Sequence, residues 1–356
     1  MNKQKTISLC MIVKNEENFL PRCLNSVKDI ADEIIIVDTG STDGTKAVAQ
    51  RYNAKIYDYE WNSNFAEARN FSISKASCDW ILILDADEEF NVLDKDKLVN
   101  FINTTELDGC HFAVHNYIGD KISNDYVTHN ALRLIKNNKK YAFAGFIHEQ
   151  ITTVDGSSAE GRFCCENIVV YHYGYLNNVV NAKEKRARNI PILLKQLEQN
   201  PDNSFNMFNL ANEYMAQKRI DEALSLYMKA YEKADKNQSF TPHLYFRIIA
   251  CLYDLNKFEQ AVKTADEGLH IYPKCTDFEF YKGLIYYRKN LHLMAVETFN
   301  RCLEMGEPPT ELRFINGCGN VRPLLCLGEI YYANQCYQKS AEYFIKALNA
   351  DNANIS

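Results

Sequence analysis

The segment from residue 80 to residue 90 reads W-I-L-I-L-D-A-D-E-E-F and joins an apolar run to a cluster of acids. A short continuous apolar run, here residues 81–84, is typical of a strand that is buried on both faces of a sheet. The four carboxylates that follow cannot all be desolvated, since each unpaired buried charge costs several kcal/mol. We therefore expect the strand to end at an open edge of an α/β sheet, where ligands bind.

Two of these acids, Asp85 and Asp87, are separated by a single small residue. An extended chain would direct both to the same side, because alternate residues of a strand share a face. A pair of hard oxygen ligands suits Mg²⁺ or Mn²⁺, which usually bridges to phosphate oxygens. The alternative is an acidic junction in water, and the short D-x-D pattern does not decide between the two.

Length, charge and cysteine content restrict the class of protein. A chain of 356 residues predicts about two to three domains. A net charge of −6, without a block of basic residues, argues against nucleic-acid binding. No apolar run is long enough for a membrane span, and the first residues lack a signal-peptide core. The twelve cysteines form no C-x-x-C pair, so we expect buried thiols and a cytoplasmic location.

Strand and helix patterns alternate over the first half of the chain. Apolar runs predict strands at residues 7–13, 33–38, 55–58 and 81–84. Amphipathic segments between them predict helices at residues 19–27, 46–52 and 64–76. This alternation predicts a Rossmann-like, largely parallel α/β sheet with helices on both faces, in a domain of residues 1–176. The loops after the first, second and fourth strands should meet at one edge.

Four sequence blocks occur in a fixed order in this half. They are M-I-V-K-N-E-E-N-F-L-P-R-C-L-N-S-V from residue 11, I-I-I-V-D-T-G-S-T-D-G-T from residue 34, A-R-N from residue 68 and L-D-A-D-E from residue 84. With these blocks, over residues 7–90, the chain resembles a family-2 glycosyltransferase of the GT-A fold. Each block alone is a weak signal, and the four in order are a strong one.

The resemblance implies a site for a nucleotide-sugar, expected to be a UDP-sugar. Asp38 would contact the base or the ribose, Arg69 would lie near the nucleotide, and Asp85 and Asp87 would hold the metal. The alternative for Arg69 is a surface ion pair with a helix neighbour. The residues expected to bind the donor are Val13, Asn15, Glu16, Asp38, Asp43, Arg69, Asp85 and Ala86.

The segment Y-A-F-A-G-F-I-H-E-Q-I carries the expected catalytic pair, His148 and Glu149. A carboxylate between apolar residues is partly desolvated, which favours a base. The resemblance supports Glu149 as the base of an inverting transfer, with His148 and Arg133 as supporting groups. Many family-2 enzymes carry an acidic E-D pair here, whereas this chain has H-E, as in the branch with helical repeats. The alternatives are a salt-bridged surface Glu149, or a base at Asp120, at Asp125 or on the substrate itself.

Strands are also expected at residues 108–118, 131–135 and 168–175, and the last of these contains His172. In GT-A enzymes, which the chain resembles, a histidine after the final strand often completes the metal site. His172 would then be a metal ligand beside Asp85 and Asp87. The alternative is a packed, hydrogen-bonded core histidine.

Residues 177–202 are expected to form a linker helix. Its basic residues are Lys183, Lys185, Arg186 and Arg188. Such a charge run is usually a solvated face, and the alternative is that it reaches over the donor diphosphate.

From residue 203 to residue 354 the pattern changes to helical repeats. Ala223, Ala261, Ala295 and Ser340 mark the units, with spacings of 38, 34 and 45 residues. The first two spacings are close to the 34-residue tetratricopeptide unit, and the third contains an insertion near residues 307–322. We therefore predict about four tetratricopeptide repeats in a solenoid.

Two further features of the repeats carry predictions. Gly283 and Gly328 should allow two helices to approach closely. A stripe of tyrosines is expected to lie mostly in the core between helices, the alternative being a carbohydrate platform: Tyr286, Tyr287, Tyr331 and Tyr332.

The two halves together resemble bacterial enzymes that glycosylate peptides or proteins, including bacteriocin S-glycosyltransferases. The resemblance implies an inverting, metal-dependent transfer from a UDP-sugar to a peptide or protein acceptor. One alternative is the same chemistry on a cell-envelope glycan or a lipid-linked acceptor. Another is a non-catalytic tetratricopeptide scaffold, and the repeats could also form a homo-oligomer.

Overall fold

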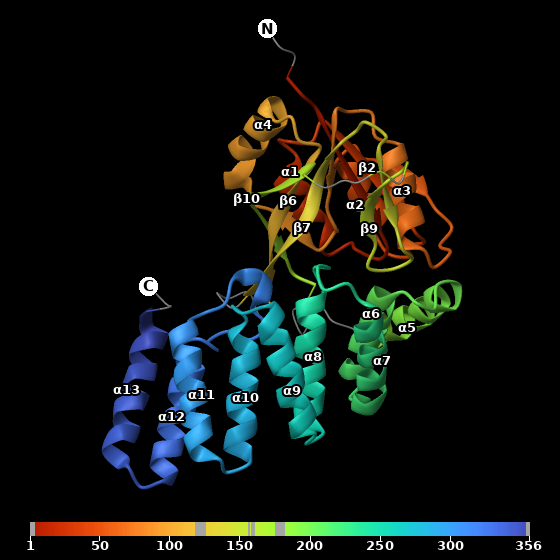
Figure 1. Ribbon diagram of the computed structural model, residues 1–356. Helices are drawn as coiled ribbons and strands as arrows, with labels where there is room; N and C mark the ends of the chain where they lie inside the picture. Colours follow the sequence, from red (N-terminus) through yellow and green to blue (C-terminus); the bar gives the residue numbers. More distant parts are fainter. Residues whose placement is uncertain (1–3, 118–125, 156, 158–160, 175–181, 354–356) are drawn as a thin grey trace. The chain divides into compact units, whose positions relative to one another are not determined.

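The computed structural model describes residues 4–117, 126–155, 157, 161–174 and 182–353 (Figure 1). The chain divides into two compact units, Met1–Ile192 and Leu193–Ser356. The candidate bases Asp120 and Asp125 lie outside the described residues, as do residues 177–181 of the expected linker and residue 354 at the expected end of the repeats. No helix in the described part of the chain combines the length and the apolar character that a membrane span requires.

The first unit is built on an eight-stranded sheet. Its strands are β1 (Ile7–Val13), β2 (Glu33–Asp38), β3 (Lys55–Asp58), β4 (Trp80–Ile83), β5 (Glu88–Phe90), β6 (Gly109–Tyr117), β7 (Tyr126–Lys136) and β10 (Phe163–His172). Their order across the sheet is β3-β2-β1-β4-β7-β6-β10-β5. The first four are parallel, as are β6 and β10, whereas β7 and β5 run antiparallel to their neighbours. This confirms the prediction of a largely parallel α/β sheet.

Helices cover both faces of this sheet. They are α1 (Leu20–Val27), α2 (Thr45–Arg51), α3 (Phe65–Ser74) and α4 (Lys95–Thr104). A further helix, α5 (Ala182–Gln199), comes after the last strand of the sheet in the sequence. In β4, Leu82 packs into the core beneath α1, α2 and α4, whereas Ile81 and Ile83 pack into a second core with Ile73 of α3. This strand is therefore buried on both faces, as its apolar run predicts. Two short strands, β8 (Tyr141–Ala144) and β9 (Gln150–Thr153), form a separate antiparallel pair.

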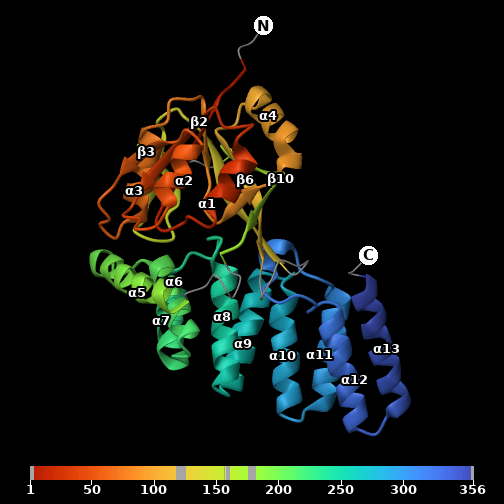
Figure 2. The ribbon, with the colours of Figure 1, turned by 180° about the vertical axis from the view of Figure 1, so that it is seen from behind.

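The second unit consists of helix pairs. They are α6 (Ser204–Ala216) with α7 (Ile220–Lys233), α8 (Thr241–Asp254) with α9 (Phe258–Ile271), α10 (Thr276–Arg288) with α11 (His292–Met305), and α12 (Val321–Ala333) with α13 (Tyr337–Ala353). Consecutive helices from α8 to α13 lie side by side in both views (Figures 1 and 2). This arrangement confirms the prediction of a tetratricopeptide solenoid.

Small residues allow the helices of each pair to pack closely. Ala223, Ala261 and Ala295 are fully buried. A Cβ atom added at Gly283 would lie 2.5 Å from Cε1 of Phe299, so this position has no room for a side chain. The same holds at Gly328, where the neighbouring ring is that of Phe344.

Three of the four tyrosines expected mostly in the core between helices pack there, and Tyr332 is the exception. Tyr286 and Tyr287 pack against a buried cluster, and Tyr331 stacks on Tyr343 with ring centroids 5.4 Å apart. Tyr332 is 64% exposed, because it lies on the outer face of α12 beside Tyr337 of the last helix.

Candidate active site

A pocket of about 310 Å³ opens at the carboxyl ends of β1, β2 and β4. Its lining comes from the segments after these strands, as expected for parallel strands, together with residues of α3 and β10. Seven of the residues predicted from the sequence line it: Val13, Glu16, Arg69, Asp85, Ala86, Asp87 and His172. The pocket is therefore the candidate site for a donor and its metal.

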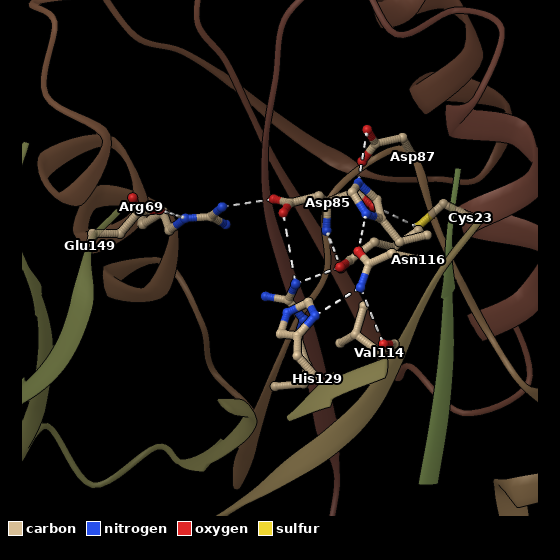
Figure 3. Close-up of polar contacts among 11 residues, drawn as sticks. Cys23, Arg69, Asp85, Asp87, Val114, Asn116, His129 and Glu149 are labelled. Carbon is tan, nitrogen blue, oxygen red and sulfur yellow. Dashed lines mark hydrogen bonds and ion pairs between the residues drawn. The ribbon is translucent and has the colours of Figure 1, made fainter. Parts of the chain in front are cut away.

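The acidic segment at this edge is a turn, which corrects the expectation that Asp85 and Asp87 share one face of a strand. β4 ends at Ile83, and the backbone N–H of Glu88 donates to the carbonyl oxygen of Asp85 at 3.0 Å. The turn directs the two carboxylates to different partners, as Figure 3 shows. Asp85 contacts Arg69, and Asp87 contacts His172.

The other two carboxylates of the segment are also paired. Arg133 donates to Glu88, and the hydroxyl group of Tyr173 donates to Glu89 at 2.5 Å. Glu88 is only 2% exposed, and burial raises its pKa although Arg133 lies beside it. Of the four carboxylates, Glu88 is thus the one that the fold buries. A charged hydrogen-bond partner replaces water there.

Arg69 joins the acidic turn to the loop that carries Glu149 (Figure 3). It lies on α3, whose first turn is capped by the side chain of Asn64. Its Nη2 donates to Oδ1 of Asp85 at 2.7 Å, and its Nε donates to Glu149. Burial alone would raise the pKa of Asp85, but Arg69 and Arg133 hold it well below its usual range. Arg69 is thus a buried bridge between distant segments, not the partner of a helix neighbour.

The loop before β9 holds Glu149 against this arginine. The backbone N–H of Phe65 donates to the carbonyl oxygen of Phe146 at 2.8 Å, which ties the loop to α3. The side chains of Glu149 and Arg69 are each 11% exposed. His148 has a φ of 53°, which is uncommon for a residue with a side chain. Neither residue of the predicted catalytic pair lines the pocket, and Glu149 is separated from Asp85 by the guanidinium group of Arg69.

Asp87 and His172 form the second polar group of the pocket. His172 Nε2 lies 3.4 Å from Oδ2 of Asp87. Its Nδ1 lies 2.7 Å from Oδ1 of Asn116, and Nδ2 of Asn116 lies 2.8 Å from Nδ1 of His129. Burial alone would lower the pKa of His172, but the hydrogen bond and charge of Asp87 raise it. Burial lowers the pKa of His129 to about 4, so this second histidine is neutral at pH 7.

A divalent metal fits Asp87 and His172 as a pair of protein ligands. Gly174 leaves the space where they meet free, since a Cβ atom there would lie 2.3 Å from Oδ2 of Asp87 and 2.6 Å from Nε2 of His172. Among the described residues, no group of three or more His, Cys, Asp and Glu side chains could hold a metal. Asp85 is engaged with Arg69, so the predicted trio is not assembled. Phosphate oxygens commonly supply the remaining ligands in such sites.

Three residues predicted to bind the donor hold loops together instead of lining the pocket. Oδ1 of Asn15 accepts from the N–H of Thr42 at 2.8 Å, and Oδ1 of Asp43 accepts from the N–H of Thr45 at 3.0 Å. Asp38 is 1% exposed, and its Oδ1 accepts two backbone N–H groups of the following loop. The contact of Asn15 joins the loops after β1 and β2, whereas those of Asp38 and Asp43 shape the loop after β2 itself.

Sequence reasoning missed an aromatic side of the pocket. Trp61 and Phe65 lie with ring centroids 4.7 Å apart, and the guanidinium group of Arg188 lies 5.0 Å from the ring of Phe65. In the sequence, the signal for this aromatic side was the presence of Trp61 and Phe65 shortly before the A-R-N block. The lining residues that were predicted neither as donor-binding nor as metal ligands are Ile12, Lys14, Thr39, Trp61, Phe65 and Arg188.

The position of Arg188 favours the alternative interpretation of the basic helix, since this residue lines the pocket. The side chains of Lys183, Lys185 and Arg186 lie outside the described part of the structure.

Comparison with protein families matches both halves of the chain. The family described as "Glycosyl transferase family 2" matches residues 8–159. The family described as "Iml2/Tetratricopeptide repeat protein 39" matches residues 151–287.

Individual relatives agree with this division. The chain is 29% identical over 287 residues to the SPbeta prophage-derived glycosyltransferase SunS of Bacillus subtilis, covering 79% of this chain and 66% of SunS. It thus spans just under two thirds of the length of that relative. It is 30% identical over 230 residues to an uncharacterized glycosyltransferase of Rickettsia typhi, covering 59% of this chain and 73% of that protein. The solved structure of S. aureus TarS 1-349 is 15% identical, covering 80% of this chain and 92% of that one, with a TM-score of 0.39. We draw no conclusion from a TM-score this low.

Proposed function

This chain belongs to glycosyltransferase family 2, and we propose that it transfers a sugar, with inversion, from a UDP-sugar to a peptide or protein. The observation that supports this most strongly is the pocket, which presents Asp87, His172 and the Arg69–Asp85 pair together at one sheet edge. Carboxylate, imidazole and guanidinium groups are the chemistry that a metal-bound diphosphate requires.

The donor is proposed to lie with its diphosphate between the Asp87–His172 pair and Arg69. A divalent metal, Mg²⁺ or Mn²⁺, would offset the charge that develops on the departing diphosphate. Nη1 of Arg69 is buried without a hydrogen-bond partner, and an anionic oxygen would satisfy it. Arg188 adds a second cation at the rim of the pocket. Both arginines favour the diphosphate as the leaving group.

Glu149 is proposed as the base for the acceptor. As the acceptor oxygen or sulfur forms its bond to the anomeric carbon, the bond from that carbon to the diphosphate oxygen breaks, and the acceptor proton passes to Glu149. The ion pair with Arg69 holds the carboxyl group of Glu149 in place, and a carboxylate is a group that can accept a proton. His148, next to it, is proposed as a supporting group.

The repeats are proposed to bind the acceptor. A tetratricopeptide solenoid leaves an extended face free for a polypeptide partner, which favours a peptide or protein acceptor over a glycan or lipid. The same repeats could also join two copies of the chain. All twelve cysteines are free thiols, which supports the proposal of a reducing cytoplasmic location.

A panel of nucleotide-sugars tests this function. Each sugar nucleotide is incubated with the full chain, with Mn²⁺ or with chelator, and scored for hydrolysis and for thermal stabilisation. We expect one UDP-sugar to be hydrolysed slowly and to raise the melting temperature only when the metal is present. The proposal is contradicted if no nucleotide-sugar does either.

A further inference from the structure

We infer that Asn116 is a positioning residue that fixes His172 in the tautomer needed to bind a metal. This inference rests on the proposed metal site. It adds a residue that neither the sequence blocks nor the pocket lining identify.

The strand register brings the three groups together. Asn116 lies on β6 opposite His172 of β10, and His129 on β7 lies opposite Val114, two residues before Asn116 on the same strand. Asn116 is 5% exposed, so its amide is shielded from water. Figure 3 shows the amide of Asn116 between the side chain of His129 and the acidic turn.

The chemistry of the amide sets the direction of each hydrogen bond. Nδ2 of Asn116 can only donate, and it faces the carbonyl oxygen of Val114 at 3.4 Å and Nδ1 of His129 at 2.8 Å. The carbonyl oxygen of Val114 can only accept, which orients the amide, and Nδ1 of His129 is then the acceptor of the second N–H bond. Oδ1 of Asn116 is then the atom that faces Nδ1 of His172 at 2.7 Å.

The orientation of Asn116 determines the form of His172. An amide oxygen can only accept, so Nδ1 of His172 must carry the proton. In the neutral imidazole, Nε2 then holds the free electron pair, and this atom is the one 3.4 Å from Asp87. Histidines that bind metals are commonly oriented by such a hydrogen bond on the other ring nitrogen.

Gly174 supports the metal site on which this inference rests. A Cβ atom at this position would lie within 2.6 Å of both Nε2 of His172 and Oδ2 of Asp87. The chain therefore leaves space beside the two atoms that would bind the metal, while Asn116 holds the opposite side of the imidazole ring.

The test measures Mn²⁺ binding and does not depend on transferase activity. Free Mn²⁺ is followed by electron paramagnetic resonance as it is titrated with the full chain, in the wild type and in the Asn116→Leu, Asn116→Asp, His172→Ala and Asn116→Leu/His172→Ala variants. Circular dichroism without metal checks that each variant is folded.

We expect Asn116→Leu to weaken Mn²⁺ binding about 10- to 100-fold, the usual effect of losing such a support. Asn116→Asp keeps an acceptor oxygen for His172, so we expect binding within about threefold of the wild type. In the His172→Ala background, Asn116→Leu should have no further effect, because Asn116 acts only through His172.

The inference is overturned if Asn116→Leu binds Mn²⁺ as tightly as the wild type. It is also overturned if Asn116→Leu weakens Mn²⁺ binding equally in the His172→Ala background, or if a folded Asn116→Asp variant binds no Mn²⁺. If Asn116→Leu does not fold, the Asn116→Asp result decides. A chain whose Mn²⁺ binding depends on His172 and, through it, on Asn116, but which transfers no sugar, would reject the proposed function and keep this inference. A chain that transfers sugar without binding Mn²⁺ would reject this inference and keep the proposed sugar transfer.

Discussion

Arg69 and Glu149 form an ion pair across 80 positions of the sequence, and each side chain is 11% exposed. Because the same guanidinium group also binds Asp85, the proposed acceptor base is linked directly to the edge that would hold the donor. The first prediction follows from this pair.

Glu149→Gln should lower the transfer rate by roughly 10²- to 10⁴-fold, because glutamine keeps the shape and the acceptor oxygen but cannot take up a proton. Donor affinity should change little, since the pocket lining does not include Glu149. Single-turnover transfer to a hydroxyl acceptor, beside a UDP titration, measures both quantities. An unchanged rate would place the base elsewhere.

Removal of the repeats should separate acceptor binding from donor binding. A chain ending at Asn200 keeps both cores of the sheet unit and should bind UDP normally and hydrolyse the donor slowly. Its KM for the acceptor should rise steeply, because the solenoid face is gone. Light scattering on the same protein checks whether truncation also converts an oligomer into a monomer. Normal acceptor kinetics in a monomeric truncation would reject recruitment by the repeats.

Asp277 should make the stability of the repeats depend on pH. Burial raises its pKa from 3.8 to about 6, although the backbone N–H groups of Phe314 and Ile315 donate to its Oδ1 at 3.1 and 2.6 Å. A raised pKa means that the folded state holds the proton more tightly than the unfolded state. The resulting stability is complete below the unfolded pKa, near pH 4, and is lost as the pH rises to about 6.

Asp277→Asn removes this dependence, because an amide does not titrate. The advantage of the variant over the wild type in free energy of unfolding should therefore grow between pH 4 and pH 6.5, by roughly 3 kcal/mol at most. Urea unfolding followed by circular dichroism at several pH values measures it. A difference that stays constant with pH would contradict the assignment.

Gly283→Ala should destabilise the chain by roughly 1–3 kcal/mol, since the added Cβ would lie 2.5 Å from Cε1 of Phe299. The better helix propensity of alanine offsets only part of this cost. Phe299→Leu in the same chain provides the control, because the smaller side chain makes room for the methyl group. The double variant should be more stable than the two single effects predict. Strict additivity would show that the contact is not the cause.

Sequence patterns predicted the architecture well, because burial leaves a local signature. The apolar run at residues 81–84 marked β4, and the small side chains of Ala223, Ala261 and Ala295 marked the places where helices meet. Such residues indicate that their own segment is buried, whichever segments it packs against.

The site was predicted less completely, because its geometry depends on contacts between distant segments. The turn at Asp85 and Asp87 separates two carboxylates that the D-A-D pattern would place on one face. The role of Asn116 depends on β6, β7 and β10 being neighbours in the sheet, and no local pattern contains that order. The amide of Asn15, in a sequence block typical of the family, contacts the next loop and does not line the pocket.

The central claim is that the pocket at the ends of β1, β2 and β4 binds a nucleotide-sugar through a metal held by Asp87. Calorimetric titration of UDP into the full chain, with Mn²⁺ and with chelator, tests it most directly in the wild type and in Asp87→Ala. We predict that Mn²⁺ strengthens UDP binding in the wild type and has no effect in Asp87→Ala, with both proteins equally folded. Equal enhancement by Mn²⁺ in the two proteins, or none in the wild type, would contradict the claim.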